Sequence, residues 1–268
     1  MIEQGVITVA QNSDVDYIRL AYLQCESLRR TNPGLPYAVV TDFQSSRDIG
    51  TSARAQFDHV IVLHEDLAEE QTWKQRNECQ LFAMTPFRET VKVECDLLFT
   101  TDISPWWRLL RNRDVVISSG CVDHQGRTAT SRRYRQAFDD NALPDIYTGL
   151  MYWRKSATAQ RLFSLARSIY LNWNDLKTQL SKTDDPGSTD MVFALAAKIM
   201  GPELVTLPTD LFRMAHLKPS MCGLLETQPW HTQLMWDMDA EGMRIAGWQQ
   251  NYPVHYHDKD FAEELQHD

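Results

Sequence analysis

The segment VKVECDLLFTTDISPWW, residues Val91–Trp107, joins an apolar, strand-like run to two acids with only Cys95 between them. Glu94 and Asp96 close the predicted strand Thr90–Asp96, and a second apolar triplet follows. Acids at positions i and i+2 of a regular strand point to the same face, and like charges held that close repel unless a cation compensates. The pattern is that of a hard divalent metal site for Mg²⁺ or Mn²⁺, or of two solvated acids at a strand end.

The segment lies within an alternation of strand-like and helical patterns. Predicted strands cover Gly5–Ala10, Tyr37–Asp42, His59–Asp66, Thr90–Asp96, Val115–Gly120 and Tyr147–Trp153. Predicted helices follow the first strand, with Ser13 or Asp14 as the cap, and cover Glu70–Met84, Ala157–Trp173 and Ser188–Met200. This order predicts an α/β fold, in which a mixed, mostly parallel central sheet is flanked by helices. With no linker visible, we expect one domain over residues 1–268.

Polar side chains stand at the predicted carboxyl ends of several strands. In open α/β sheets ligands bind beyond these ends. We therefore expect Gln11, Asn12, Asp42, Glu94 and Asp96 to gather along one edge of the sheet.

The composition sets limits on the function. The 268 residues are 43% hydrophobic and 24% charged, as in an ordinary globular protein. A net charge of −9 argues against a protein dominated by contacts with nucleic-acid phosphates. No apolar run approaches the roughly 18 residues that span a bilayer, and the N-terminus reads as a strand and not as a signal peptide. Five scattered cysteines favour a reducing, cytoplasmic location.

The longer segment Met84–Trp107 resembles the D-x-D region of nucleotide-sugar glycosyltransferases with the GT-A fold, in particular family 8. Thr85-Pro86-Phe87 is similar to the turn that precedes the strand in that family, and Glu94-Cys95-Asp96 takes the place of D-x-D. The resemblance implies a single GT-A (Rossmann-like) domain. Its nucleotide-binding half would cover about residues 1–105, and its acceptor- and sugar-binding half about 106–268. The first carboxylate departs from the family pattern, because Glu94 is not an aspartate.

The tail segment PVHYHDK, residues 253–259, resembles the C-terminal element of the same family. There a histidine completes the metal shell and a lysine holds the diphosphate. The resemblance makes His255 the third metal ligand beside Glu94 and Asp96, with His257 as its competitor, and makes Lys259 a phosphate contact. The implied cofactor is Mn²⁺ or Mg²⁺.

Other positions follow from the resemblance. The end of the first strand would meet the nucleotide, and YTGLMYW would line the sugar pocket with Tyr147 in place of the family's asparagine. The implied donor-binding residues are Ala10, Gln11, Asn12, Glu94, Cys95, Asp96, Thr148, Gly149 and Lys259. Asp190, at the start of a helix, would lie near the donor sugar, although capping alone also favours an acid there.

The family also places a basic residue on the helix before the D-x-D strand. This chain has Glu78 at the closest position, and Arg76 or Lys74 is the candidate to reach the same space. Arg76 and Asp190 are therefore the predicted catalytic residues.

The predicted function is metal-dependent transfer of a sugar, with retention of configuration, from a nucleotide-diphosphate donor, UDP-linked in the first instance, to an unknown hydroxyl. The acceptor is a glycan, a small molecule or a protein. One alternative keeps the fold but glycosylates nucleic-acid bases, with a basic segment holding the phosphates: Arg127, Arg132, Arg133 and Arg135. A second alternative is a nucleotide-sugar-binding scaffold without activity.

Overall fold

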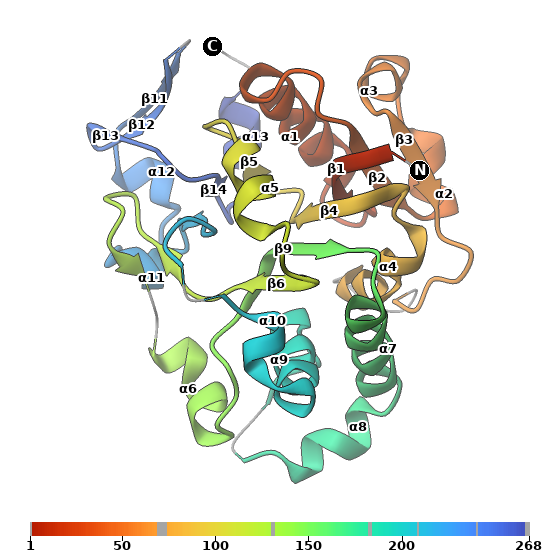
Figure 1. Cartoon of the computed structure of the whole chain (residues 1–268). Helices are drawn as coiled ribbons and strands as arrows, with labels where there is room; N and C mark the ends of the chain where they lie inside the picture. The colour runs from red at the N-terminus through yellow and green to blue at the C-terminus, as the bar shows by residue number, and fades with distance from the viewer. Residues whose placement is uncertain are drawn as a thin grey trace.

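The computed structural model describes residues 2–68, 74–129, 132–181, 184–207, 209–239 and 241–265, with the side chains of 132–134 outside this description. A six-stranded sheet forms its centre, in the order β3-β2-β1-β4-β9-β6 (Figure 1). Its strands are β1 (Ile2–Val9), β2 (Tyr37–Thr41), β3 (His59–Val62), β4 (Phe87–Val93), β6 (Val115–Ser118) and β9 (Tyr147–Arg154). The first four strands in this order run parallel, and β9 is antiparallel to both of its neighbours. The mixed, mostly parallel sheet is thus confirmed.

Helices cover both faces of this sheet because its strands are apolar on both sides. Val6 belongs to one hydrophobic cluster and its neighbour Ile7 to the other, as the two-residue period of a strand requires. The first cluster contains the buried face of α1 (Tyr17–Thr31). The second contains the buried faces of α7 (Ala157–Leu171) and α9 (Thr189–Met200), which lie on the opposite side of the sheet in Figure 1.

Helix starts follow the capping rules, with one shift from the prediction. Ser188 accepts a hydrogen bond from the Met191 amide and caps α9 as expected. The cap of α1 is Asp16, whose carboxylate accepts from the amide of Arg19. Ser13 and Asp14, the predicted caps, precede it in the loop, so the helix begins later than the sequence pattern indicates.

Two smaller sheets complete the fold, and the sequence predicted neither. The first has the order β5-β14-β10-β7-β8. Its strands are β5 (Leu97–Leu98), β7 (Cys121–Val122), β8 (Thr128–Ala129), β10 (Ala215–His216) and β14 (Val254–His255). The second consists of β11 (Trp236–Asp239), β12 (Gly242–Ile245) and β13 (Trp248–Gln249). Antiparallel pairing of β14 with β5 places His255 opposite Leu97, immediately after the two acids.

The remaining elements are short. They are α2 (Phe43–Asp48), α3 (Thr51–Gln56), η1 (Lys74–Gln80), α4 (Leu81–Met84), α5 (Ser104–Leu110), α6 (Arg132–Asp140), α8 (Trp173–Leu176), η2 (Lys177–Gln179), α10 (Pro202–Val205), α11 (Pro219–Cys222), α12 (Trp230–Gln233) and α13 (Phe261–Glu264). Among the described residues, no helix combines the length and hydrophobicity needed to cross a bilayer.

Several boundaries differ from the predictions, and β3, predicted to extend to Asp66, ends at Val62. The strand predicted to end at Asp96 ends at Val93, so the two acids follow it in a turn. The helix predicted over Glu70–Met84 is the 3₁₀ helix η1 followed by α4, and residues 69–73 lie outside the described residues. The basic segment Gly126–Gln136, whose sequence has no clear period, contains β8 and the start of α6.

Candidate functional site

The turn that carries the two acids is held by backbone contacts on both sides. The Glu94 amide donates to the carbonyl of Gly149, 3.2 Å away on β9. From α1, the buried Gln24 amide donates to the carbonyl oxygens of Glu94 and Leu97. The prediction that Glu94 and Asp96 lie on a regular strand is wrong, because β4 ends at Val93 and the chain turns before β5 begins at Leu97. The turn nevertheless directs both carboxylates to the same place.

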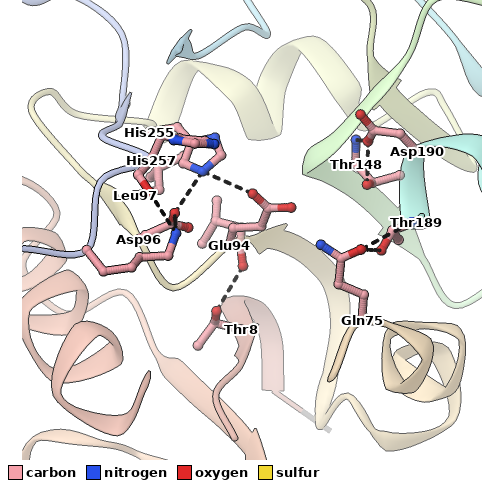
Figure 2. A network of polar contacts seen from close by, with 12 residues as sticks. Thr8, Gln75, Glu94, Asp96, Leu97, Thr148, Thr189, Asp190, His255 and His257 are labelled. Carbon is pink, nitrogen blue, oxygen red and sulfur yellow. Dashed lines mark hydrogen bonds and ion pairs between the residues drawn. The ribbon is translucent and has the colours of Figure 1, made fainter. Parts of the chain in front are cut away.

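His255 joins the two carboxylates into one cluster. Its Nε2 lies 2.9 Å from Asp96 Oδ2 and 3.1 Å from Glu94 Oε2 (Figure 2). One ligand atom from each of the three residues falls within 4.8 Å of the others. The ring of His216, on the neighbouring strand β10, stacks on that of His255 with 4.5 Å between centroids and 7° between planes. Strand pairing and stacking together fix the direction of the His255 ring.

The charges of this cluster depend on one another. Burial disfavours the charge on Asp96, but His255 and Lys259, which pairs with its Oδ2, hold its pKa well below the usual range. Burial lowers the pKa of His255, but the carboxylates of Asp96 and Glu94 outweigh burial and raise it. Burial lowers the pKa of His257 to about 4, and the charges of His255 and Lys259 add to this effect.

The cluster fits a divalent metal. Two carboxylate oxygens and one imidazole nitrogen are ligands that Mn²⁺ and Mg²⁺ accept. The side chains of Asp96 and His255 are 5% and 6% exposed, so their polar atoms have few partners besides one another. His257 is not a member of the cluster that can hold the metal, although it lines the same cavity.

A cavity of about 410 Å³ opens beside the cluster. Many of the predicted site residues line it: Gln11, Glu94, Cys95, Asp96, Thr148, Gly149, Asp190, His255, His257 and Lys259. The residues come from the ends of β1 and β4, from the start of β9, from α9 and from the tail. The strand-end prediction and the tail prediction therefore describe the same cavity.

The end of β1 contributes to the cavity through Gln11. Its Nε2 donates to Asp42 and Asp66, both at 3.1 Å, and its Oε1 accepts from Asn77 at 2.7 Å. The predicted gathering of Gln11 and Asp42 at one edge is thus observed.

The other two predicted residues of this strand end have structural tasks. Asn12 Oδ1 accepts from the amide of Ile18, 3.0 Å away, and holds the start of α1. Ala10 is fully buried. Neither is among the described residues that line the cavity. The contact of Asn12 with α1 and the burial of Ala10 direct both residues into the fold.

Thr148 and Asp190 lie across the cavity from the metal cluster (Figure 2), and Gly149 lines the cavity beside Glu94. The amide and hydroxyl of Thr148 both donate to Asp190 Oδ1 at 2.7 Å. A Cβ at Gly149 would lie 2.8 Å from Met214 Cε and 3.3 Å from Glu94 Oε2. A side chain at this position would therefore displace the end of Met214 and crowd the Glu94 carboxylate.

Of the two cations predicted at the start of η1, Lys74 lies at the cavity, together with two residues that the sequence did not suggest for it. Lys74, Gln75 and Glu78 line it, and Arg76 is not among the described lining residues. A 3₁₀ helix repeats every three residues, so Gln75 and Glu78 share a side that Arg76 does not. Gln75 Oε1 lies 3.3 Å from the Thr189 hydroxyl at the start of α9. Sequence reasoning missed Gln75, Thr189 and His216, since none of them belongs to a recognisable motif.

The basic segment is not a free cationic surface in its described part. The Arg135 side chain is 0% exposed, donates to Asp190 Oδ2 at 2.8 Å and stacks on the Tyr147 ring at 3.6 Å. Arg127 is exposed but pairs with Asp123 at 2.7 Å. The side chains of Arg132 and Arg133 lie outside the described residues. Arg135 therefore cannot hold a nucleic-acid phosphate, because it is buried against acids and rings.

Comparison with known proteins relates the chain to no sequence family. No protein-family model matches it, and no curated protein matches it significantly. Similar solved structures include mouse xyloside xylosyltransferase 1, with 12% identity, a TM-score of 0.49, and coverage of 77% of this chain and 85% of that chain. An active-site mutant of LgtC has 11% identity and a TM-score of 0.49, over 75% of this chain and 71% of that chain.

The glycosyltransferase GlyE of Streptococcus pneumoniae has 13% identity and a TM-score of 0.46, over 78% of this chain and 46% of that chain. Likenesses at this level concern the arrangement of elements. The function has to be inferred from the cavity and its residues.

Proposed function

We propose that the chain is a metal-dependent glycosyltransferase, which moves a sugar from a nucleotide-diphosphate donor, UDP-linked in the first instance, to a hydroxyl acceptor. One observation carries the proposal. Glu94, Asp96 and His255 converge at one end of a cavity, with Lys259 beside them. The resemblance to family 8 assigns these positions to the metal and the diphosphate. Two motifs about 160 residues apart would otherwise have no reason to meet.

Glu94, Asp96 and His255 would hold the cation, and Mn²⁺ is the ion that we expect. Such a cation neutralises negative charge on a departing diphosphate. Lys259 supplies a second positive charge at the same end, because the negative charge of Asp96 outweighs burial and raises the lysine pKa. A preset cation of this kind stabilises charge that develops during bond cleavage.

The opposite wall would hold the sugar. Asp190 is oriented by Thr148 on one oxygen and by Arg135 on the other, so its carboxylate cannot rotate freely. Gly149 lines the same cavity, between Thr148 and the Glu94 carboxylate. We propose that Thr148, Gly149 and Asp190 contact the donor sugar, and that the sugar keeps its anomeric configuration, as the resemblance to family 8 implies.

A donor-hydrolysis assay tests the proposal. Wild type with Mn²⁺ should release sugar from at least one nucleotide sugar, and Asp96→Ala should lose most of this activity. Asp210→Ala is the control, because Asp210 is an exposed aspartate that pairs with nearby Arg213. Equal hydrolysis by wild type and Asp96→Ala would show that the metal assignment is wrong.

A thermal-shift assay tests the alternative of an inactive scaffold. A stabilisation that needs both UDP and Mn²⁺ supports a working donor site. The absence of any shift with UDP, GDP, CDP and dTDP contradicts the transferase proposal. Stabilisation without hydrolysis or transfer favours the scaffold.

A further inference from the structure

A buried ion pair lies beneath the sugar end of the cavity. Lys92 Nζ is 2.6 Å from Glu78 Oε2, and the two side chains are 1% and 7% exposed. Glu78 belongs to η1, and Lys92 lies on β4, two residues before Glu94. A carboxylate therefore stands at the position where the resemblance implies a cation, with a lysine of the strand beside it.

The pair is connected to the wall that faces the metal cluster. Lys92 Nζ also donates to the carbonyl of Thr148, 2.9 Å away. Thr148 in turn donates to Asp190 from its amide and its hydroxyl. A continuous buried chain of contacts thus runs from Glu78 through Lys92 and Thr148 to Asp190.

The two ends of this chain line the cavity, whereas Lys92 lies behind it. Glu78 and Asp190 are both lining residues, and Lys92 is not among the described ones. A carboxylate offers about four acceptor positions, and one ammonium group cannot use them all. Glu78 therefore keeps acceptor capacity on the side of the cavity.

Stability alone does not account for such a pair. Removing two charges from water is costly, and apolar residues of similar volume often stabilise a fold as well or better. A carboxylate aimed into a cavity, with its charge balanced from behind, is useful for binding hydroxyl groups. Its hydrogen bonds to a hydroxyl-rich ligand are stronger than those of a neutral acceptor.

We propose that Glu78 accepts hydrogen bonds from hydroxyl groups of the donor sugar, and that Lys92 is a positioning residue that orients both Glu78 and Thr148. The assignment rests on the proposed function, since it presumes a nucleotide-sugar donor in this cavity. Glu78 then determines affinity for the sugar, whereas Asp96, His255 and Lys259 determine affinity for the metal and the diphosphate.

Calorimetric binding with Mn²⁺ separates the two parts of the donor. The probes are UDP, UDP-glucose, UDP-galactose and UDP-xylose. We expect Glu78→Gln and Lys92→Met to weaken the best-bound UDP-sugar roughly tenfold, as for one lost hydrogen bond to a charged group, and to change the Kd for UDP by less than about twofold. Glu203→Gln and Lys177→Met make the same chemical changes at exposed positions and should match wild type.

Two further variants separate positioning from stability. The double variant Glu78→Gln/Lys92→Met leaves neither partner of the pair as an unpaired buried charge. It is used in the binding assay in place of the single variants if these fail to fold. Glu78→Lys/Lys92→Glu keeps opposite charges in contact but places a carboxylate beside the Thr148 carbonyl. We expect this exchanged pair to remain deficient in sugar binding while it still binds UDP.

Three results would overturn the assignment: wild-type affinity for UDP-sugars in the variants, equal weakening of UDP and UDP-sugar, or full recovery in the exchanged pair. A wild type that binds neither UDP nor any UDP-sugar contradicts the proposed function itself. The failure of this inference is thereby distinguished from the failure of the function on which it rests.

Discussion

His255 Nε2 lies 2.9 Å from Asp96 Oδ2, although 159 residues separate the two in the chain. The contact exists because β14 pairs with β5, the two-residue strand that begins directly after Asp96. The candidate metal site therefore forms where β4 of the central sheet, which precedes the two acids, meets a small sheet that carries His255. Its integrity depends on the tail as much as on the acidic turn.

The two tail histidines should differ in their effect on metal binding. We expect His255→Ala to abolish the thermal shift that Mn²⁺ produces, because a ligand is lost from the cluster. His257→Asn should keep a shift with Mn²⁺, since His257 is outside the cluster and asparagine tolerates its left-handed backbone, at φ 62°. The reverse pattern in a thermal-shift titration would make His257 the ligand.

Metal affinity should fall as the pH falls. The metal-free cluster holds a proton on His255 with a raised pKa, and a metal must displace that proton. We expect the Kd for Mn²⁺ to rise by up to about tenfold per pH unit between about pH 8 and about pH 6. Titration calorimetry in matched buffers measures this, and an affinity that does not depend on pH would contradict the shared proton.

In the metal-free protein, the contribution of His255 to the free energy of unfolding should change with pH in the opposite direction to metal affinity. A raised pKa on His255 stabilises the folded state below the ordinary histidine pKa, and this contribution is lost as the pH rises through the raised value. Urea unfolding with a chelator present, at the same pH values, measures this contribution. His255→Ala is the control in which it should disappear.

Two arginines of the basic segment should differ strongly in their contribution to stability. Arg135→Met removes a fully buried guanidinium and leaves the Asp190 carboxylate without that partner, at a cost of about 3 kcal/mol in the free energy of unfolding. Arg127→Met, at an arginine whose side chain is 66% exposed, should cost less than about 1 kcal/mol. Urea unfolding compares them, and similar losses would show that the burial of Arg135 is not decisive.

Duplex DNA should not bind with the salt dependence of a phosphate-contacting protein. The net charge is −9, and Arg135 is buried. We expect no change in the anisotropy of a labelled duplex at low salt, where electrostatic binding is strongest. Binding that weakens steeply with added salt would instead favour the nucleic-acid acceptor.

Much of the central sheet could be predicted because its signal is local. Strands such as β2 are continuous apolar runs, and helices such as α9 have a recognisable cap. The two smaller sheets could not be predicted in this way. Strands of two residues, such as β5 and β14, have no periodicity, and only their partners define them.

The candidate site, too, could be predicted only where its signal is local in the sequence. Residue type and resemblance were enough to single out Asp96 and Lys259 and to limit the histidine that joins them to His255 or His257. The cation that balances Glu78 could not be predicted, because Lys92 is a single polar residue within a strand. Its role depends on Glu78 and Thr148, which come from two other elements.

The sequence by itself determined the alternation of strands and helices, the acidic turn and the tail motif, because each of these depends on residues that are close together in the chain. Only the tertiary structure decided which of two histidines meets the acids, where Arg135 lies and how the charge of Glu78 is balanced. These features depend on side chains from separate elements sharing a space from which water is excluded. In such a space every charge needs a partner, and that partner cannot be deduced from the order of residues in the chain.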